Sequence, residues 1–274
     1  MLYSAAAFQT WDDQVFAHLI VDVSDHILTV TLNRPDKKNA MTPLMVKEIA
    51  YALAYAHHTT DIWAVVLQAN GDTFCAGADL KAFMGNEPEV TDSTIPNPEE
   101  EILIGELFIG LHKPCIAKVA GPVYAGGFLL ICGCTHVVAS EAAHFSLPEV
   151  KRGIWPMQVM ESLLQIIPAR KVLDLCMRAN VMSGTEAEEL GLVTHSTTAD
   201  QLDGVVEELL ADIIKNSPNA IRQGLKAYDE LRKIDDSKKH QYLQDQLHKL
   251  LKSEDAREGI KAFKEKRPPN WTGN

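Results

Sequence analysis

The chain has 274 residues, of which 46% are hydrophobic and 23% charged, a composition typical of a globular protein and not of a disordered one. Its formal net charge of −11 would repel a polyanion, so we expect no nucleic-acid partner. No apolar run approaches the length of a membrane span, and the first residues lack the pattern of a signal peptide. We therefore expect a cytoplasmic protein with no membrane partner.

The first elements in chain order predict strands around a helix. Two β-rich runs within residues 18–33 predict a pair of strands that meet at Asp25. Thr42 followed by Pro43, a cap and then a proline, predicts a helix that continues to about His57. The apolar run at 62–69 then predicts a strand buried on both faces.

The same alternation is expected further along the chain. We expect a helix within residues 99–111 and a strand within 115–120, which would repeat the strand, helix, strand pattern of a crossover unit. The acidic, proline-containing segment 85–98 has the composition of a mobile surface loop, and either a plain loop or a lid fits it.

After residue 155 the periodicity becomes predominantly helical. The sequence therefore predicts an α/β core of repeated ββα-like units followed by a helical section. We divide the chain into an N-terminal extension (1–17), an α/β core (18–200) and a C-terminal helical region (201–274).

Two small-residue segments are candidates for binding chemistry. In FCAGADL, small residues let another group approach the backbone, and Asp79 is placed to cap a helix that begins at Leu80. In YAGGFLLICG, Gly126 and Gly127 open an apolar helix whose first N–H groups lack partners within the helix. Taken singly, each segment also has a plain interpretation, as a strand-to-helix turn and as tight packing.

A third segment, FSLPEVKRGIWP, carries one acid. Pro148 fixes the backbone directly before Glu149, and the flanking apolar residues predict a partly desolvated carboxyl group with a raised pKa. A lone glutamate is more often a solvated surface residue. The histidines lack the spacing of a metal site, so we assign no metal, and no motif for serine hydrolysis, nucleotide hydrolysis or dinucleotide binding occurs.

Five segments in one order carry a family resemblance: NRPDKKNAM, FCAGADLKAF, KPCIAKVAGPVYAGG, FSLPEVKRGIWP and SEDAREGIKAFKEKRP. Together they resemble the crotonase superfamily, the enoyl-CoA hydratase/isomerase family, over nearly the whole chain. The resemblance implies a crotonase-like spiral of ββα units with a helical C-terminal trimerisation region. It also implies a homotrimer or dimer of trimers and an acyl-CoA or enoyl-CoA thioester substrate, with no cofactor because CoA belongs to the substrate.

The resemblance also implies roles for particular residues. The backbone N–H groups of Ala78 and Gly126 would form an oxyanion hole for an enolate, and Glu149 would move the proton. The implied CoA-binding positions, of which the last two commonly act across a subunit boundary, are Lys37, Lys38, Ala78, Asp79, Leu80, Lys81, Gly126, Gly127, Phe263 and Lys266.

The sequence departs from the family pattern at Leu129, where typical hydratases carry their first glutamate. Hydration usually shares its proton transfers between two carboxylates, whereas a double-bond shift needs one group that removes a proton and returns it elsewhere. Thr135 and the segment 157–162 also depart from the pattern. We favour isomerisation and keep single-acid hydration as a close rival. Two further alternatives are another crotonase chemistry, decarboxylation or thioester hydrolysis, and a non-catalytic CoA-binding protein.

Overall fold

The computed structural model describes residues 2–85, 91–98 and 100–274. Its centre is a six-stranded sheet with the order β1-β2-β3-β4-β6-β9. The strands are β1 (Leu19–Ser24), β2 (Ile27–Leu32), β3 (Ala64–Ala69), β4 (Cys115–Val119), β6 (His136–Ser140) and β9 (His195–Thr197). The first two are antiparallel and the other neighbours are parallel, so the expected strand pair and buried strands are confirmed.

A second, three-stranded sheet contains β5 (Val123–Tyr124), β7 (His144–Ser146) and β8 (Met182–Ser183). The chain alternates between the two sheets before it turns helical. β4 is followed by β5 and helix α3 (Gly127–Cys132), and β6 is followed by β7 and the 3-10 helix η5 (Pro148–Arg152). This repetition confirms the crotonase-like spiral of ββα units.

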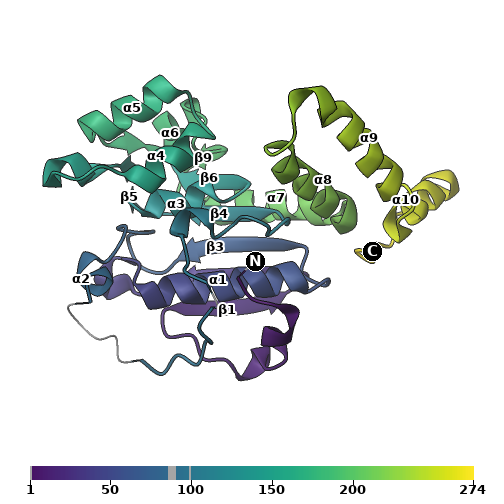
Figure 1. The fold of residues 1–274 in the computed structure, drawn as a ribbon, viewed down its shortest axis with the longest axis horizontal. Coiled ribbons are helices and arrows are strands. Elements are labelled where there is room, and N and C mark those ends of the chain that lie inside the picture. The colour runs from purple at the N-terminus through teal and green to yellow at the C-terminus, as the bar shows by residue number, and fades with distance from the viewer. Residues whose placement is uncertain (1, 86–90, 99) are drawn as a thin grey trace.

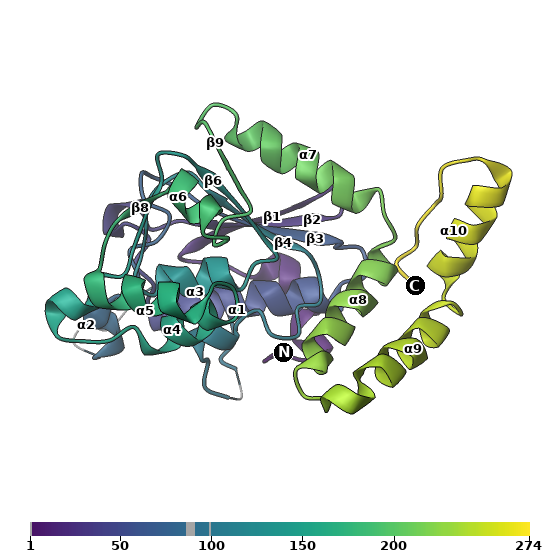
Figure 2. The same cartoon turned by 90° about the horizontal axis from the view of Figure 1, so that it is seen from above.

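Helices cover both faces of the large sheet. Figures 1 and 2 show α1 (Pro43–His58) and α3 on one face and α7 (Leu202–Ile214) on the other. The alternation of side chains along β3 explains this, because Val65 and Leu67 join the main core while Ala64 and Val66 pack with α7. Thr42 caps α1 as expected, since its side chain accepts a hydrogen bond from the N–H of Met45 at 3.1 Å.

The remaining elements are short helices around the core and longer ones at the C-terminus. The α-helices are α2 (Leu80–Phe83), α4 (Met157–Leu164), α5 (Ala169–Arg178), α6 (Gly184–Glu189), α8 (Pro218–Leu231), α9 (Lys239–Leu250) and α10 (Glu254–Glu265). The other 3-10 helices are η1 (Ala5–Phe8), η2 (Trp11–Asp13), η3 (Pro35–Lys37), η4 (Ile104–Glu106) and η6 (Asp236–Lys238). No helix in the described parts of the chain is long and apolar enough to cross a membrane.

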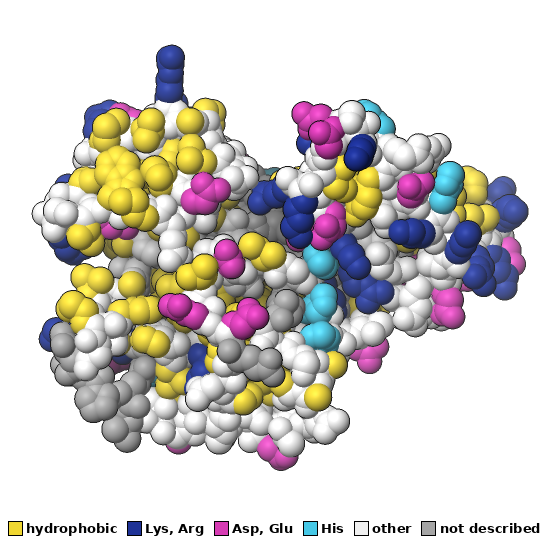
Figure 3. Space-filling view, viewed as in Figure 1, with side chains coloured by type: hydrophobic (Ala, Val, Ile, Leu, Met, Phe, Trp, Pro, Cys, Tyr) yellow, Lys and Arg dark blue, Asp and Glu magenta, His cyan; other side chains and the backbone are white. Residues whose placement is uncertain are grey.

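Helices α8, α9 and α10 project from the sheets (Figures 1 and 2). At their border with the core, Nε2 of His112 lies 3.1 Å from Oδ2 of Asp229 on α8, and Figure 3 shows histidine side chains in a row along this border. The predicted C-terminal helical section is thus present. Its trimerisation role and the division at residues 17 and 200 stay predictions.

The helix expected within residues 99–111 is wrong for the described residues 100–111, where the only helical element is the 3-10 helix η4. Gly110 has a φ of +80° and His112 a φ of +52°, values that end a right-handed helix. Residue 99 and part of the expected 85–98 loop, residues 86–90, lie outside the described residues. Ile95 is only 4% exposed, so the segment does contribute to the core.

Residues 2–18, which we name the N-terminal arm, pack against α1. Trp11 stacks on Tyr55 with ring centroids 3.6 Å apart, and Tyr3 meets Tyr51 edge to face at 5.2 Å. The hydroxyl of Tyr51 donates to the carbonyl of Ala7 at 2.8 Å. The arm is therefore part of the packed structure.

Candidate active site

Three short parallel segments build the candidate site. β5 pairs in parallel with β7, with Tyr124 opposite Ser146. A parallel bridge pairs Cys75 with Val123 and places the segment before α2 on the other side of β5. Because parallel segments leave a sheet in the same direction, the residues that follow all three emerge at one edge.

Three residues lie at that edge, each three positions beyond a paired residue. Ala78 follows Cys75, Gly126 follows Val123, and Glu149 follows Ser146. We name Ala78, Gly126 and Glu149 the reactive edge. The structure thus brings together the three residues to which the resemblance assigns chemistry.

Glycine lets the neighbouring segments approach closely. A Cβ on Gly77, whose φ is +94°, would lie 2.7 Å from the Cβ of Ala125, and one on Gly127 would lie 2.9 Å from the carbonyl oxygen of Cys75. A Cβ on Gly126 would lie 3.4 Å from the nitrogen of Ala78. The packing interpretation of the glycines is confirmed, and this tight packing also places the two backbone nitrogens close to one another. Their role in binding stays a prediction.

The N–H groups of Ala78 and Gly126 have no backbone acceptor within the described parts of the chain. Ala78 forms a parallel bridge with Met41 in which Gly77 supplies the accepting carbonyl and Asp79 the donating N–H, each at 2.8 Å. The intervening N–H of Ala78 therefore points away from Met41. Two free donors at one spot can stabilise a negative charge that forms there.

Glu149 carries a buried carboxylate, one oxygen of which lacks a hydrogen-bond partner in the described parts of the chain. It is 7% exposed, and its Oε2 has no hydrogen-bond partner among the described residues. Burial raises the pKa of this carboxyl group, opposed by its own backbone N–H and by the charge of Arg152. The raised pKa expected from the apolar flanks is confirmed in direction, and a raised pKa favours a carboxyl group that both accepts and returns a proton.

Lys37 and Lys38 lie beside the AGAD segment. The carbonyl of Lys38 accepts a hydrogen bond from the N–H of Ala76 at 3.0 Å, and both lysines are exposed. Leu80 and Lys81 are also exposed, so the four residues are accessible to a ligand. Asp79 instead has a local task, because its side chain accepts from the N–H of Ala82 at 3.4 Å and caps α2 as predicted.

Sequence reasoning missed the residues that hold this loop. Asn39 is fully buried, and its amide donates to the carbonyls of Asn70 at 2.9 Å and Thr73 at 2.7 Å. Arg34 lies 3.5 Å from Asp79. The available signal was an asparagine directly after Lys38 in a proline-containing turn, since asparagine tolerates the positive φ of +51° found at Asn39.

Leu129 lies on α3 one helical turn beyond Gly126 and is 5% exposed. Its Cδ2 would lie 3.8 Å from a Cβ on Gly105, whose N–H donates to the side-chain carbonyl of Gln158 at 3.2 Å. Leu129 therefore supplies no carboxylate at this position, and the two neighbours described here, Gly105 and Gln158, are uncharged.

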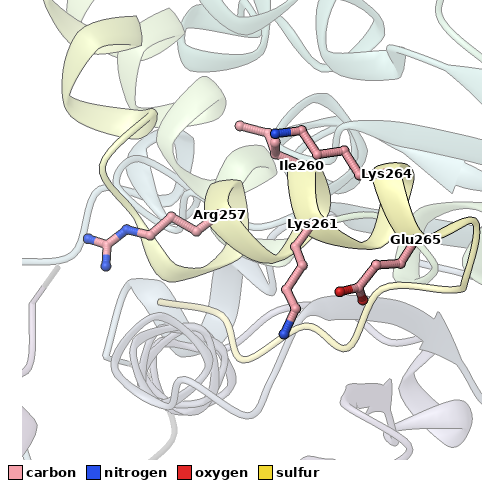
Figure 4. A pocket seen from close by; sticks show the side chains of 5 residues that line it. All are labelled: Arg257, Ile260, Lys261, Lys264 and Glu265. Carbon is pink, nitrogen blue, oxygen red and sulfur yellow. The ribbon is translucent and has the colours of Figure 1, made fainter.

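Phe263 and Lys266 are not brought to the reactive edge within one chain. Phe263 is on α10 and is 85% exposed, and α10 lies at the far end of the molecule from α2 and α3 (Figure 1). Figure 4 shows Arg257, Lys261 and Lys264 on this helix, around a hollow of about 350 Å³. A role for Phe263 or Lys266 at the site would require a second subunit.

The family model described as enoyl-CoA hydratase/isomerase matches residues 22–274. Together with the ββα spiral, this match shows the class of protein that the fold and the edge define. The chain belongs to the enoyl-CoA hydratase/isomerase family within the crotonase superfamily.

Similar proteins support the same family. A mevalonyl-coenzyme A hydratase of Aspergillus fumigatus is 33% identical over 90% of this chain and 91% of its own length. An enoyl-CoA hydratase of Mycobacterium tuberculosis is 32% identical over 92% and 95%. A crystal structure of an enoyl-CoA hydratase from Mycobacterium tuberculosis aligns with a TM-score of 0.81 and 30% identity, over 94% of this chain and all of the other.

No group of three or more histidine, cysteine, aspartate or glutamate side chains is placed to hold a metal ion in the described ranges. The assignments of no metal and no separate cofactor stay predictions.

Proposed function

We propose that the protein shifts the double bond of an enoyl-CoA thioester, with Glu149 as the single acid and base. The observation that carries the proposal is the unpartnered, buried Oε2 of Glu149 at the same edge as the free N–H groups of Ala78 and Gly126. An enolate-forming reaction needs this combination of a poised base and fixed donors.

The proposed reaction balances with one carboxylate. Glu149 removes a proton from C2 of a 3-enoyl thioester, and the released electron pair forms a dienolate whose negative charge resides on the thioester oxygen. The N–H groups of Ala78 and Gly126 stabilise that charge. The protonated Glu149 then returns the proton to C4, which restores the carbonyl group and leaves a 2-enoyl thioester. The apolar side chain of Leu129 takes no part in proton transfer.

Single-acid hydration is the second candidate. The observation that favours it is that similar proteins include several named as hydratases, among them the mevalonyl-coenzyme A hydratase and the enoyl-CoA hydratase of Mycobacterium tuberculosis. In this alternative the carboxylate of Glu149 removes a proton from water while the hydroxide adds to C3 of a 2-enoyl thioester, and the protonated Glu149 then delivers that proton to C2 of the resulting enolate. The absence of an acid at Leu129 argues for isomerisation, and the names of the relatives argue for hydration.

The substrate would bind by its CoA portion. We propose that Lys37, Lys38, Asp79, Leu80 and Lys81 contact CoA near the exposed end of the AGAD segment, beside the glycine pair of α3. Phe263 and Lys266 of a neighbouring subunit would complete the site in a homotrimer or a dimer of trimers. Their distance from the reactive edge within one chain supports this arrangement (Figure 1).

Product analysis tests the proposal. The full-length protein is incubated with 2-enoyl-CoA and 3-enoyl-CoA thioesters of several chain lengths, beside Glu149→Gln and a control, Glu208→Gln, at an exposed position of α7. We expect conversion of the 3-enoyl thioester to the conjugated product. The Glu149 variant should lose about 10²- to 10⁴-fold in kcat/KM, the usual contribution of general acid–base catalysis, and the Glu208 variant none.

The same assays identify the alternatives. Formation of hydroxyacyl-CoA from the 2-enoyl thioester would establish hydration. Equal turnover by wild type and Glu149→Gln would exclude Glu149 as the base. Tight binding of CoA thioesters without turnover would favour a non-catalytic CoA-binding protein.

A further inference from the structure

Glu48 is a second buried carboxylate, remote from the reactive edge in sequence. It lies on α1 with no exposed surface. Its Oε1 accepts from the N–H of Ala17 at 2.7 Å and from the hydroxyl of Ser93 at 2.7 Å, and its Oε2 accepts from the N–H of His18 at 2.9 Å. One side chain therefore joins the N-terminal arm to the segment after α2.

Further hydrogen bonds join the same two segments. The N–H of Val15 donates to the hydroxyl of Thr94 at 2.8 Å, and the N–H of Thr94 donates to the carbonyl of Val15 at 3.1 Å. The hydroxyl of Tyr3 donates to the carbonyl of Pro96 at 2.9 Å. We name Glu48, the N-terminal arm and residues 91–97 the arm clamp.

The arm clamp holds the middle of a connection whose two ends lie at the candidate site. One end is α2, which begins directly after Ala78 and Asp79. The other end is η4, where Gly105 approaches Leu129 and donates to Gln158. Residues 91–97 are anchored to α1 by the buried carboxylate, at a point along the chain between α2 and η4.

We propose that Glu48 is a positioning residue of the enoyl-CoA site, which acts by fixing residues 91–97 and through them α2 and η4. This inference rests on the proposed function for its kinetic consequence. Glu48 lies apart from the three reactive-edge residues, so its loss weakens binding of substrate and transition state alike. Such a uniform loss raises KM and leaves kcat nearly unchanged.

Two substitutions in the full-length protein test the proposal. Ser93→Ala removes one hydrogen bond from Glu48 and leaves the bonds to the arm in place. Glu48→Gln keeps the shape but turns an amide group toward backbone donors. We expect KM for the enoyl-CoA substrate to rise about tenfold in Ser93→Ala, the lower end of what one hydrogen bond to a charged carboxylate contributes, and further in Glu48→Gln. Glu208→Gln serves as the matched control and should keep the wild-type KM.

Hydrogen exchange gives a readout independent of turnover. Amides of residues 91–97, and those of 78–83 and 104–107, should exchange faster in both variants than in wild type. A lower melting temperature with unchanged KM, and unchanged exchange at 78–83 and 104–107, would reduce Glu48 to a purely structural role and overturn the proposal. If wild type turns over no enoyl-CoA, the proposed function fails. Hydrogen exchange at 78–83 and 104–107 still decides whether Glu48 positions α2 and η4.

Discussion

The reactive edge and the arm clamp each contain a buried glutamate, and the two differ in what surrounds the carboxylate. Glu48 accepts hydrogen bonds at both oxygens from three donors. Glu149 is buried to a similar degree, yet its Oε2 has no partner among the described residues. A buried polar group without a partner costs free energy, whereas a satisfied one stabilises the fold.

This difference distinguishes an acid that fixes parts of the chain from one that we propose to be reactive, a distinction that residue type and burial do not make. The backbone shows the same contrast. The N–H groups of Ala17 and His18 are satisfied by Glu48, while those of Ala78 and Gly126 have no backbone acceptor in the described residues. Hydrogen-bond donors and acceptors that lack partners and lie at one edge are available to bind a ligand.

After the loss expected for Glu149→Gln, the largest effect should follow from Gly126→Ala, which adds a methyl group at the reactive edge. The new methyl group would lie 3.3 Å from Cε of Met41 and 3.4 Å from the nitrogen of Ala78, so it would crowd the proposed oxyanion donors. We expect kcat/KM to fall about 10²- to 10³-fold, the usual cost of losing one oxyanion donor, with the fold retained. Steady-state kinetics with circular dichroism would measure both.

The control for this substitution is Gly204→Ala on α7, where a Cβ would meet no atom within 4 Å. It should leave kinetics unchanged and stabilise the helix by about 0.5–1 kcal/mol. A Gly126→Ala enzyme as active as wild type would exclude an oxyanion at this edge.

A smaller effect, on stability alone, is expected at Asp255, which resembles Glu48. It is 1% exposed and accepts from the hydroxyl of Ser217 at 2.8 Å and from the N–H groups of Thr272 at 2.9 Å and Gly273 at 3.2 Å. Asp255→Asn would set an amide against these donors and lower the free energy of unfolding by about 1–3 kcal/mol. Urea denaturation would show the loss. A large change in kcat with unchanged stability would contradict the contrast between satisfied and open acids.

The smallest effect concerns pH and tests the open carboxylate directly. The pKa of Glu149 is raised above its ordinary 4.5, so folding favours the protonated form. Below pH 4.5 both states are protonated and no penalty exists. As pH rises through the raised pKa, wild type should lose stability relative to Glu149→Gln. Paired denaturation curves between pH 4 and pH 8 would measure the difference, and a constant difference would contradict the shift.

Much of the site was predictable from sequence because it is local. The sequence shows small residues near Ala78 and Gly126. It also shows a proline before Glu149 and apolar residues around it. Their convergence rests on a two-residue pairing between β5 and β7 and on a single bridge, which have no periodicity to detect. The resemblance supplied that information.

The arm clamp was not predictable. Glu48 lies on a helix, where the sequence alone predicts an exposed glutamate. Its hydrogen-bond donors Ala17, His18 and Ser93 lie 31, 30 and 45 positions away along the chain. The helix expected within 99–111 failed for a related reason. Leu107 and Leu111 are buried, but the turns between them are of the 3-10 type and Gly110, with a positive φ, ends the helical geometry.

The in-register strands β5 and β7 have an evolutionary consequence. The donors of Ala78 and Gly126 belong to the backbone, so the proposed stabilisation of an enolate would not depend on which side chains surround it. Positions such as Leu129 and those on α4 can change without disturbing the two nitrogens. We therefore expect single substitutions at such positions to change which proton-transfer reaction is catalysed. A one-residue deletion between Val123 and Gly126 would instead move Gly126 away from Ala78 and abolish every such reaction.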